Sequence, residues 1–218
     1  MRKAVLVAVD DYPAPYTLSG SVESMNDFSY WVQMSGFSIT TLTNANATKA
    51  NILSNLTALV QEAQPGESLC FGFWGHGGQI PSQEDDGYSE GLCAYDAFSG
   101  GVVWDYEVDS ILSGLPANVN VDLVFGCCFS GGIVEVPGVN VVSWQACRET
   151  EYAARIQFAD GSVRSLFSLL LCMALQMAPL ATRNDLFNYA AYWTTYYVPN
   201  QHPVLRCTQS ERYQLMFM

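Results

Sequence analysis

The chain has 218 residues, of which 50% are hydrophobic and 14% are charged. This length and composition suit one domain with a sizeable core and are not typical of a disordered protein. The formal net charge of −12 argues against nucleic acid and anionic membrane surfaces as partners.

Acidic residues are concentrated in the middle of the chain. From Ala50 to Cys147 there is no lysine or arginine, whereas the same segment contains twelve aspartates and glutamates. Such a segment is typical of a solvated surface that aids solubility. Alternatively, it forms a negative rim that attracts a cationic substrate.

Short apolar runs alternate with segments of helical periodicity along the chain. Strands are predicted at 4–10, 37–43, 67–75, 118–128 and 139–147, with a last strand or extended tail near 202–207. Helices are predicted at 20–35, 46–63, 105–115, 163–178 and around 183–192, and 80–103 is predicted to be mostly loop. This alternation favours an α/β fold with a mostly parallel central sheet and helices on both faces.

Residues 165–181 are the most apolar stretch of the sequence. Two serines, Gln176 and Pro179 interrupt this stretch, so a core helix is predicted rather than a membrane helix. The seven cysteines are odd in number and include no CxxC pair. This usage indicates reduced thiols in a cytoplasmic protein, without a disulfide framework or a metal site.

Reactive residues follow three of the predicted strands, in the segments "DDYP" (10–13), "GHGG" (75–78) and "GCCFSGG" (126–132). Ligand sites of parallel sheets lie at the carboxyl ends of strands. Adjacent strand residues point to opposite faces, so only one of Cys127 and Cys128 is expected to face a cleft. A nearby histidine promotes thiol ionisation, so His76 and one of these cysteines predict a nucleophilic pair.

The order of these motifs resembles that of metacaspases and other caspase-like cysteine peptidases. The likeness rests on "GHGGQ" (75–79), "EDDGYSEGLCAYD" (84–96) and "CCFSGG" (127–132), and it extends to "VDDYPAPYTLSGSV" (9–22), "VSWQACRETEYAAR" (142–155) and "NQHPVL" (200–205). It implies a caspase-like α/β/α sandwich over 1–218. Within this single peptidase domain, a large-subunit-like part covers about 1–132 and a small-subunit-like part about 139–218.

The resemblance also implies a role for each residue of the pair. By the family pattern, Cys128 is the nucleophile, Cys127 is a core thiol and His76 is the general acid and base. The backbone N–H groups of Gly77 and Cys128 would form the oxyanion hole. The implied reaction is peptide-bond hydrolysis through a thioester, with a protein or peptide as substrate. A remote relation to the legumain type is the alternative within this class of enzyme.

The chain departs from the family at three positions of the pocket for a basic substrate residue. Ser24 and Gly126 stand where relatives have aspartates, and Trp74 stands where they have a small residue. A buried guanidinium needs a carboxylate partner. Asp27 could supply one, as could either aspartate at the end of the first strand. We therefore expect a more neutral pocket and a preference altered from basic.

The family's calcium-binding positions match only in part. Asp105 is retained, whereas Ser89, Tyr106 and Glu135 occupy other matched positions. Calcium binds six to eight oxygens, so no cofactor is expected and calcium dependence is the alternative. Asp85 and Asp86 are interpreted as residues of a solvated turn.

The join between the two subunit-like parts, residues 131–140, is short and has no basic residue. We therefore expect an uncut, monomeric chain whose recruitment or inhibition depends on a separate partner. The alternative function, from another class, is a catalytically weak caspase-like module that binds peptides or partner proteins.

Overall fold

The computed structural model describes residues 1–82, 87–135 and 138–217. These residues form a six-stranded central sheet with the strand order β11-β8-β7-β3-β1-β2. Five strands run parallel and only β11 is antiparallel to its neighbour. The strands are β1 (Arg2–Ala8), β2 (Ser38–Thr43), β3 (Ser68–Trp74), β7 (Asn120–Phe125), β8 (Val141–Gln145) and β11 (Val204–Arg206).

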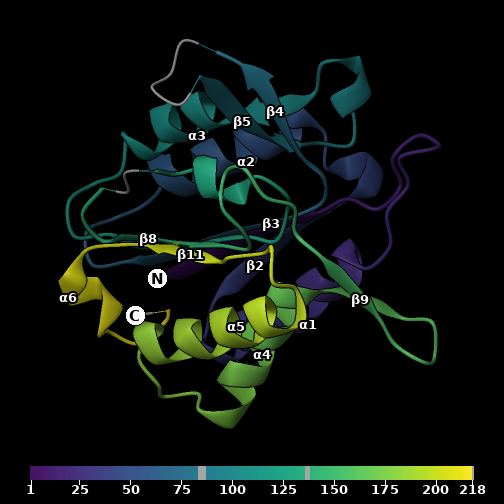
Figure 1. Ribbon diagram of the computed structural model, residues 1–218. Helices are drawn as coiled ribbons and strands as arrows, with labels where there is room; N and C mark the ends of the chain where they lie inside the picture. The colour runs from purple at the N-terminus through teal and green to yellow at the C-terminus, as the bar shows by residue number, and fades with distance from the viewer. Residues whose placement is uncertain (83–86, 136–137, 218) are drawn as a thin grey trace.

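Helices cover both faces of the sheet (Figure 1). Helices α1 (Ser21–Met34), α4 (Leu166–Met177) and α5 (Arg183–Tyr197) contribute to the core on one face. Helices α2 (Lys49–Gln61) and α3 (Asp105–Leu112) contribute to the core on the other. The short α6 (Gln209–Arg212) follows β11. The predicted α/β/α sandwich with a mostly parallel sheet is confirmed.

Local sequence signals explain where two of these helices begin. The Thr48 hydroxyl accepts a hydrogen bond from Asn51 N, so Thr48 rather than Asn46 caps α2. Thr182 caps α5 in the same way by accepting from Asp185 N.

Helix α4 buries most of its apolar side chains, as predicted for a core helix. No helix among the described residues is long and apolar enough to cross a membrane.

The prediction of a mostly irregular segment at 80–103 is wrong. A second, three-stranded antiparallel sheet is formed by β4 (Gly77–Pro81), β5 (Tyr88–Cys93) and β6 (Val102–Trp104). The prediction interpreted the glycines of this segment as loop residues. Gly91 instead has a packing role in the sheet, because a Cβ there would lie 2.4 Å from Val102 Cγ1. Asp85 and Asp86, predicted to form a solvated turn, lie outside the described residues.

The start of the helix predicted at 163–178 is also wrong. Residues 163–165 form the strand β10 (Val163–Ser165), which pairs with β9 (Arg155–Gln157) in an antiparallel hairpin. Helix α4 begins only at Leu166. The two strands are short and partly exposed, so the apolar periodicity of the helix masked the hairpin.

A buried ion pair joins β7 to α5. Arg183 donates from Nε to Asp122 Oδ1 at 3.1 Å and from Nη2 to Asp122 Oδ2 at 2.9 Å, and both side chains are 2% exposed. Asp122 also accepts hydrogen bonds from Trp144 Nε1 and Phe217 N. This carboxylate therefore ties two strands of the sheet to α5 and to the end of the chain.

Removing one partner of this pair leaves an uncompensated buried charge. Arg183→Met is expected to lower the free energy of unfolding by about 3–5 kcal/mol. The matched control is Lys3→Met, which breaks the exposed pair between Lys3 and Glu62 and is expected to cost under about 1 kcal/mol. Chemical denaturation of both variants measures the difference. Equal effects would contradict a special role for the buried pair.

Candidate active site

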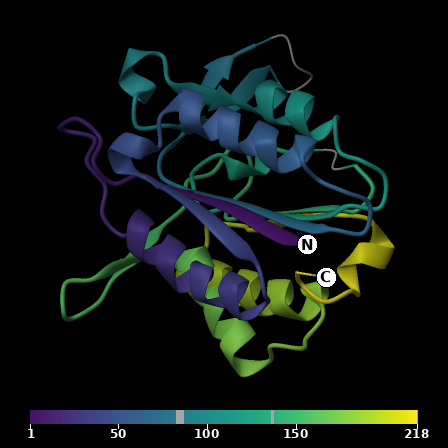
Figure 2. The ribbon, with the colours of Figure 1, turned by 180° about the vertical axis from the view of Figure 1, so that it is seen from behind.

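The two loops that carry His76 and Cys128 leave the same edge of the sheet. Strands β3 and β7 are parallel neighbours, with Phe73 paired to Phe125 at the end of the ladder. Their following residues therefore meet beyond the carboxyl ends of the strands, where parallel sheets form their sites. The segment between β1 and α1 and the β9–β10 hairpin project from the same side of the molecule (Figure 2).

Close backbone contact fixes the two loops against each other. A Cβ added to Gly77 would lie 1.9 Å from the carbonyl oxygen of Cys128 and 3.3 Å from its nitrogen. Only glycine permits this approach. The backbones of Gly77 and Cys128 are therefore in direct contact.

Tyr12 and Tyr16 orient His76. Nε2 of the imidazole lies 2.9 Å from the carbonyl oxygen of Tyr16, which can only accept a hydrogen bond. This contact assigns the proton to Nε2 and leaves Nδ1 unprotonated in the neutral ring. The Tyr12 hydroxyl accepts from His76 N and donates to the Cys93 carbonyl. These contacts fix the orientation of the imidazole.

The two adjacent cysteines occupy different environments. Cys127 is 1% exposed and belongs to the core beside α2 and α3, whereas Cys128 is partly exposed. Ala153 N lies 3.4 Å from Cys128 Sγ and donates to it. Phe129 then adopts a left-handed conformation, with φ 57°, which is unusual for an aromatic residue. The prediction that one of the two thiols is buried in the core is confirmed, but strand alternation is not its cause. The strand predicted at 118–128 ends at Phe125, and both cysteines lie in the loop that follows it.

Electrostatics favour an initially neutral pair. Burial lowers the pKa of His76 below its ordinary value, although the hydrogen bond to the Tyr16 carbonyl partly opposes this. Burial raises the pKa of the Cys128 thiol, and the hydrogen bond from Ala153 N and the Arg155 charge oppose this rise. Burial alone therefore disfavours both ionised forms, and the local hydrogen bonds partly restore them.

Three of the predicted pocket residues lie together in a buried cluster. Trp74 is 0% exposed and Ser24 is 1% exposed. Trp74 Nε1 donates to Ser168 Oγ at 2.7 Å, and Ser24 Oγ accepts from Ser165 N. A Cβ added to Gly126 would lie 2.4 Å from Trp74 Cδ1, so the indole covers this glycine. The indole thus fills the space beside Gly126.

Asp27 lies apart from that cluster and has a different partner. Its carboxylate accepts a hydrogen bond from Arg164 Nε at 2.5 Å. Asp10 accepts from Ser21 N and Val22 N at the start of α1. Both carboxylates therefore already have partners in this conformation.

The residues considered for calcium are used within the fold. Asp105 accepts hydrogen bonds from Glu90 N and Tyr106 N. Among the described residues, no three side chains of metal-binding type are grouped closely enough to hold an ion. All seven cysteines, each within the described ranges, are free thiols.

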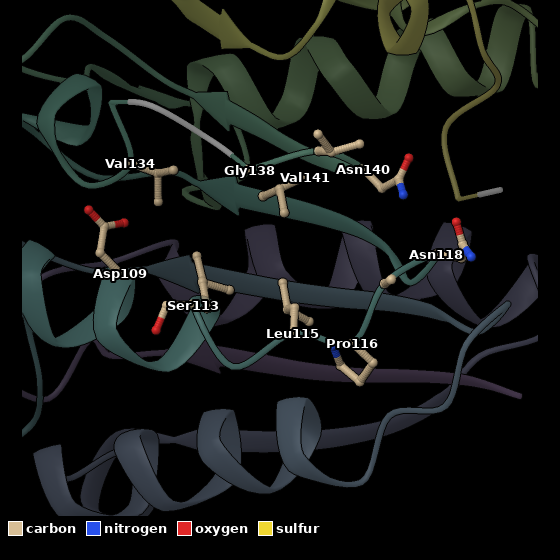
Figure 3. Close-up of a pocket in the computed structure, with 12 residues that line it drawn as sticks. Asp109, Ser113, Leu115, Pro116, Asn118, Val134, Gly138, Asn140 and Val141 are labelled. Atoms are coloured by element: carbon tan, nitrogen blue, oxygen red, sulfur yellow. The ribbon is translucent and has the colours of Figure 1, made fainter.

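Figure 3 shows a cavity of about 540 Å³ whose lining includes neither His76 nor Cys128. Its lining includes Asn118 and Asn140, which precede the amino ends of β7 and β8, and contains neither cysteine nor histidine. The pair lies at the opposite, carboxyl edge of the sheet. The candidate site is therefore identified by its histidine and cysteine side chains and not by this cavity.

Sequence reasoning missed four groups around the pair. The Tyr16 carbonyl and the Ala153 N–H are backbone groups, which no residue type reveals. Tyr12 belongs to the "DDYP" segment, where the strand-end argument pointed to the region but not to the side chain. Arg155, which lies between Ala154 and Ile156, is an isolated basic residue in an apolar context, and this was a usable signal.

Solved structures with the same fold include caspases. Over 100% of this chain and 98% of the other, a Geobacter sulfurreducens protein superposes with a TM-score of 0.79 at 17% identity. The Drosophila initiator caspase Dronc superposes with a TM-score of 0.68 at 14% identity, over 99% and 82% of the two chains. At these identities the likeness defines the fold, which is caspase-like.

The sequence comparison narrows this class to one family. The model of the metacaspase, peptidase C14 domain matches residues 2–137, and the chain belongs to this family. Metacaspase-1 of Coccidioides immitis and metacaspase-1A of Aspergillus niger are each 33% identical over 150 residues, or 62% of this chain. The alignments cover 32% and 37% of those relatives, so this chain matches about a third of their length.

Two neighbouring glycines provide a matched test of the backbone contact. Gly77→Ala places a methyl group against the Cys128 carbonyl, whereas the same group at Gly78 meets Cys93 Sγ at an ordinary 3.4 Å. Gly77→Ala keeps the backbone N–H, but its methyl group forces the loop away from Cys128, and moving this proposed oxyanion donor out of place is expected to lower kcat/KM about 100-fold or more. Gly78→Ala is expected to stay within a few-fold of the parent. Steady-state kinetics would contradict the assignment if the two effects were alike.

Proposed function

We propose that this chain is a cysteine endopeptidase in which Cys128 is the nucleophile and His76 the general acid and base. Membership of the metacaspase family suggests cysteine peptidase function. The observation that carries the finer assignment is the contact of Gly77 with the Cys128 backbone, next to an imidazole oriented by the Tyr16 carbonyl.

In the first half of the reaction, the peptide is cleaved and its acyl part is retained. His76 Nδ1 accepts the Cys128 proton as Sγ attacks the peptide carbonyl carbon. The carbonyl oxygen becomes an oxyanion that accepts hydrogen bonds from Gly77 N and Cys128 N. The C–N bond then breaks, the leaving amine takes the proton from His76, and a thioester remains on Cys128.

In the second half, water releases the acyl group. His76 accepts a proton from water as the water oxygen attacks the thioester carbonyl. The C–S bond breaks, and the Cys128 thiolate recovers its proton from His76. Every proton is thus returned, and the step needs neither metal nor cofactor. Five further properties stay predictions. They are independence of calcium, a monomeric state, an uncut chain, a separate regulatory partner and a cytoplasmic location.

The buried Trp74 cluster supports the proposal that substrate preference differs from that of relatives with a basic pocket. Trp74 covers Gly126, and Ser24 bonds to the start of α4. The competing function is a catalytically weak binding module, and the same cluster favours it because the pocket residues of active relatives are replaced. Measurements of peptide hydrolysis separate the peptidase from the binding module.

The two adjacent cysteines provide the direct test of the nucleophile. Cys128→Ala is expected to lower kcat/KM by at least about 10⁴-fold on a peptide mixture that varies the residue before the scissile bond. Cys127→Ala, its matched control, removes a buried sulfur and is expected to cost roughly 1 kcal/mol of stability with activity retained. The reverse pattern in a folded Cys127→Ala protein would overturn the assignment. Absence of turnover in the parent would favour the binding module.

The acid limb of the pH–rate profile tests the role of His76. Protonated imidazole cannot accept the thiol proton, so activity falls as pH drops through the pKa of His76. Because burial lowers this pKa from the ordinary 6.5, kcat/KM is expected to stay high at pH 6.5 and decline only below it. Measurement across pH 4–9 locates the limb, and a midpoint at or above about pH 7 would be inconsistent with this environment.

A further inference from the structure

The segment that follows β8 lies against the loop of Cys128 at two points. Ala153 N donates a hydrogen bond to Cys128 Sγ at 3.4 Å. Two residues earlier in the same segment, the carbonyl oxygen of Glu151 accepts a hydrogen bond from Phe129 N at 2.9 Å. The position of the Cys128 thiol therefore depends on how this segment is held.

The contact at Phe129 matters because the backbone there is left-handed. Phe129 follows Cys128 directly and has φ 57°. This conformation is strained for a residue with a side chain, so it persists only where the surrounding structure holds it. The Glu151 carbonyl provides one such contact, and the ring of Tyr152 provides another by packing against the Phe129 ring at a centroid distance of 5.1 Å. Displacement of Glu151 would therefore loosen the turn next to Cys128.

The carboxylate of the same Glu151 binds His202, which lies two residues before β11. His202 donates from its backbone N to Glu151 Oε2 at 2.7 Å, and its ring Nδ1 lies 2.6 Å from Oε1. Burial raises the pKa of Glu151, but the hydrogen bonds from His202 and from Arg148 N outweigh this effect and lower it. An ionised carboxylate can only accept hydrogen bonds, so Nδ1 of His202 carries the proton.

Gln201 holds the two ends of this segment. Its buried side-chain amide accepts from Ala154 N at 2.9 Å and donates to the Ala146 carbonyl at 2.8 Å. Glu151 lies between these two points. Its hydrogen bonds with His202 hold the middle of the segment against the residues that precede β11.

We infer that His202 is a positioning residue for the nucleophile and that it acts through Glu151. Its ring holds the Glu151 carboxylate in place. The backbone of Glu151 then supports Phe129, and the N–H group two residues later faces the Cys128 thiol. This inference rests on the proposed peptidase function and adds a residue outside the dyad to it. A displaced thiol reacts in a poorer geometry, which slows the chemical step more than it weakens peptide binding.

Substitutions that remove or retain the ring donor test this inference on the peptide that the parent cleaves best. His202→Phe keeps a ring but lacks the Nδ1 donor, and it is expected to lower kcat about tenfold with KM within about twofold of the parent. His202→Asn offers an amide N–H near the position of Nδ1 and is expected to restore kcat to within about threefold. Glu151→Gln replaces an acceptor oxygen by an NH2 group and is expected to behave like His202→Phe.

The matched control is Lys49→Met, which breaks another ion pair at the start of α2. Lys49 Nζ lies 2.7 Å from Glu107 Oε2, and both side chains are 24% exposed, compared with 37% and 14% for His202 and Glu151. This variant is expected to keep the kcat of the parent, and thermal melts of all variants report folding.

The possible outcomes separate this inference from the proposed function. Parent-like kcat in folded His202→Phe or Glu151→Gln overturns the inference alone. The same holds for a loss that appears in KM instead of kcat, for a His202→Asn protein as slow as His202→Phe, and for an equal loss in Lys49→Met. Absence of Cys128-dependent hydrolysis in the parent overturns the proposed function as well.

Discussion

The candidate site depends on one steric constraint, which is the contact of the Gly77 backbone with the Cys128 carbonyl. Strands β3 and β7 bring these residues to the same edge of the sheet, and the absence of a Cβ at Gly77 allows the loops to touch. The contact holds the loop of His76 against the loop of Cys128, and the proposed oxyanion hole of Gly77 N and Cys128 N rests on it. Preorganised donors of this kind need no rearrangement as negative charge develops, which is why they contribute strongly to acyl transfer.

Support for the dyad comes from segments far apart in the chain. The segment after β1 supplies the Tyr16 carbonyl and the Tyr12 hydroxyl, and the segment after β8 supplies Ala153 N. The ion pair of Asp122 and Arg183 connects β7, the strand that leads to Cys128, with α5. The geometry of the candidate pair thus depends on contacts between segments that are far apart in the chain. Trp74 meanwhile fills the space beside Gly126.

Periodicity and strand-end logic predicted the sheet, the covering helices and the position of the pair. Strand alternation was the wrong reason for separating Cys127 from Cys128, because β7 ends at Phe125 and both cysteines lie in the loop after it. Periodicity failed at β4–β6, because Gly91 has a packing role that composition cannot show, and at β10, which a strongly helical pattern follows directly. Backbone groups such as the Tyr16 carbonyl carry no residue signature and therefore could not have been predicted. The burial of Trp74 depends on tertiary packing with Ser168, which lies 94 positions away in the chain.

Trapping the acyl-enzyme tests the central claim most directly. Rapid acid quenching of the protein with an excess of peptide substrate, followed by proteolysis and mass spectrometry, locates the acyl group. The account predicts an adduct with the mass of the amino-terminal product, attached to Cys128 and removed by hydroxylamine, a strong nucleophile that cleaves thioesters. An adduct on Cys93, Cys127 or Cys147, or hydrolysis without any thioester, would contradict it.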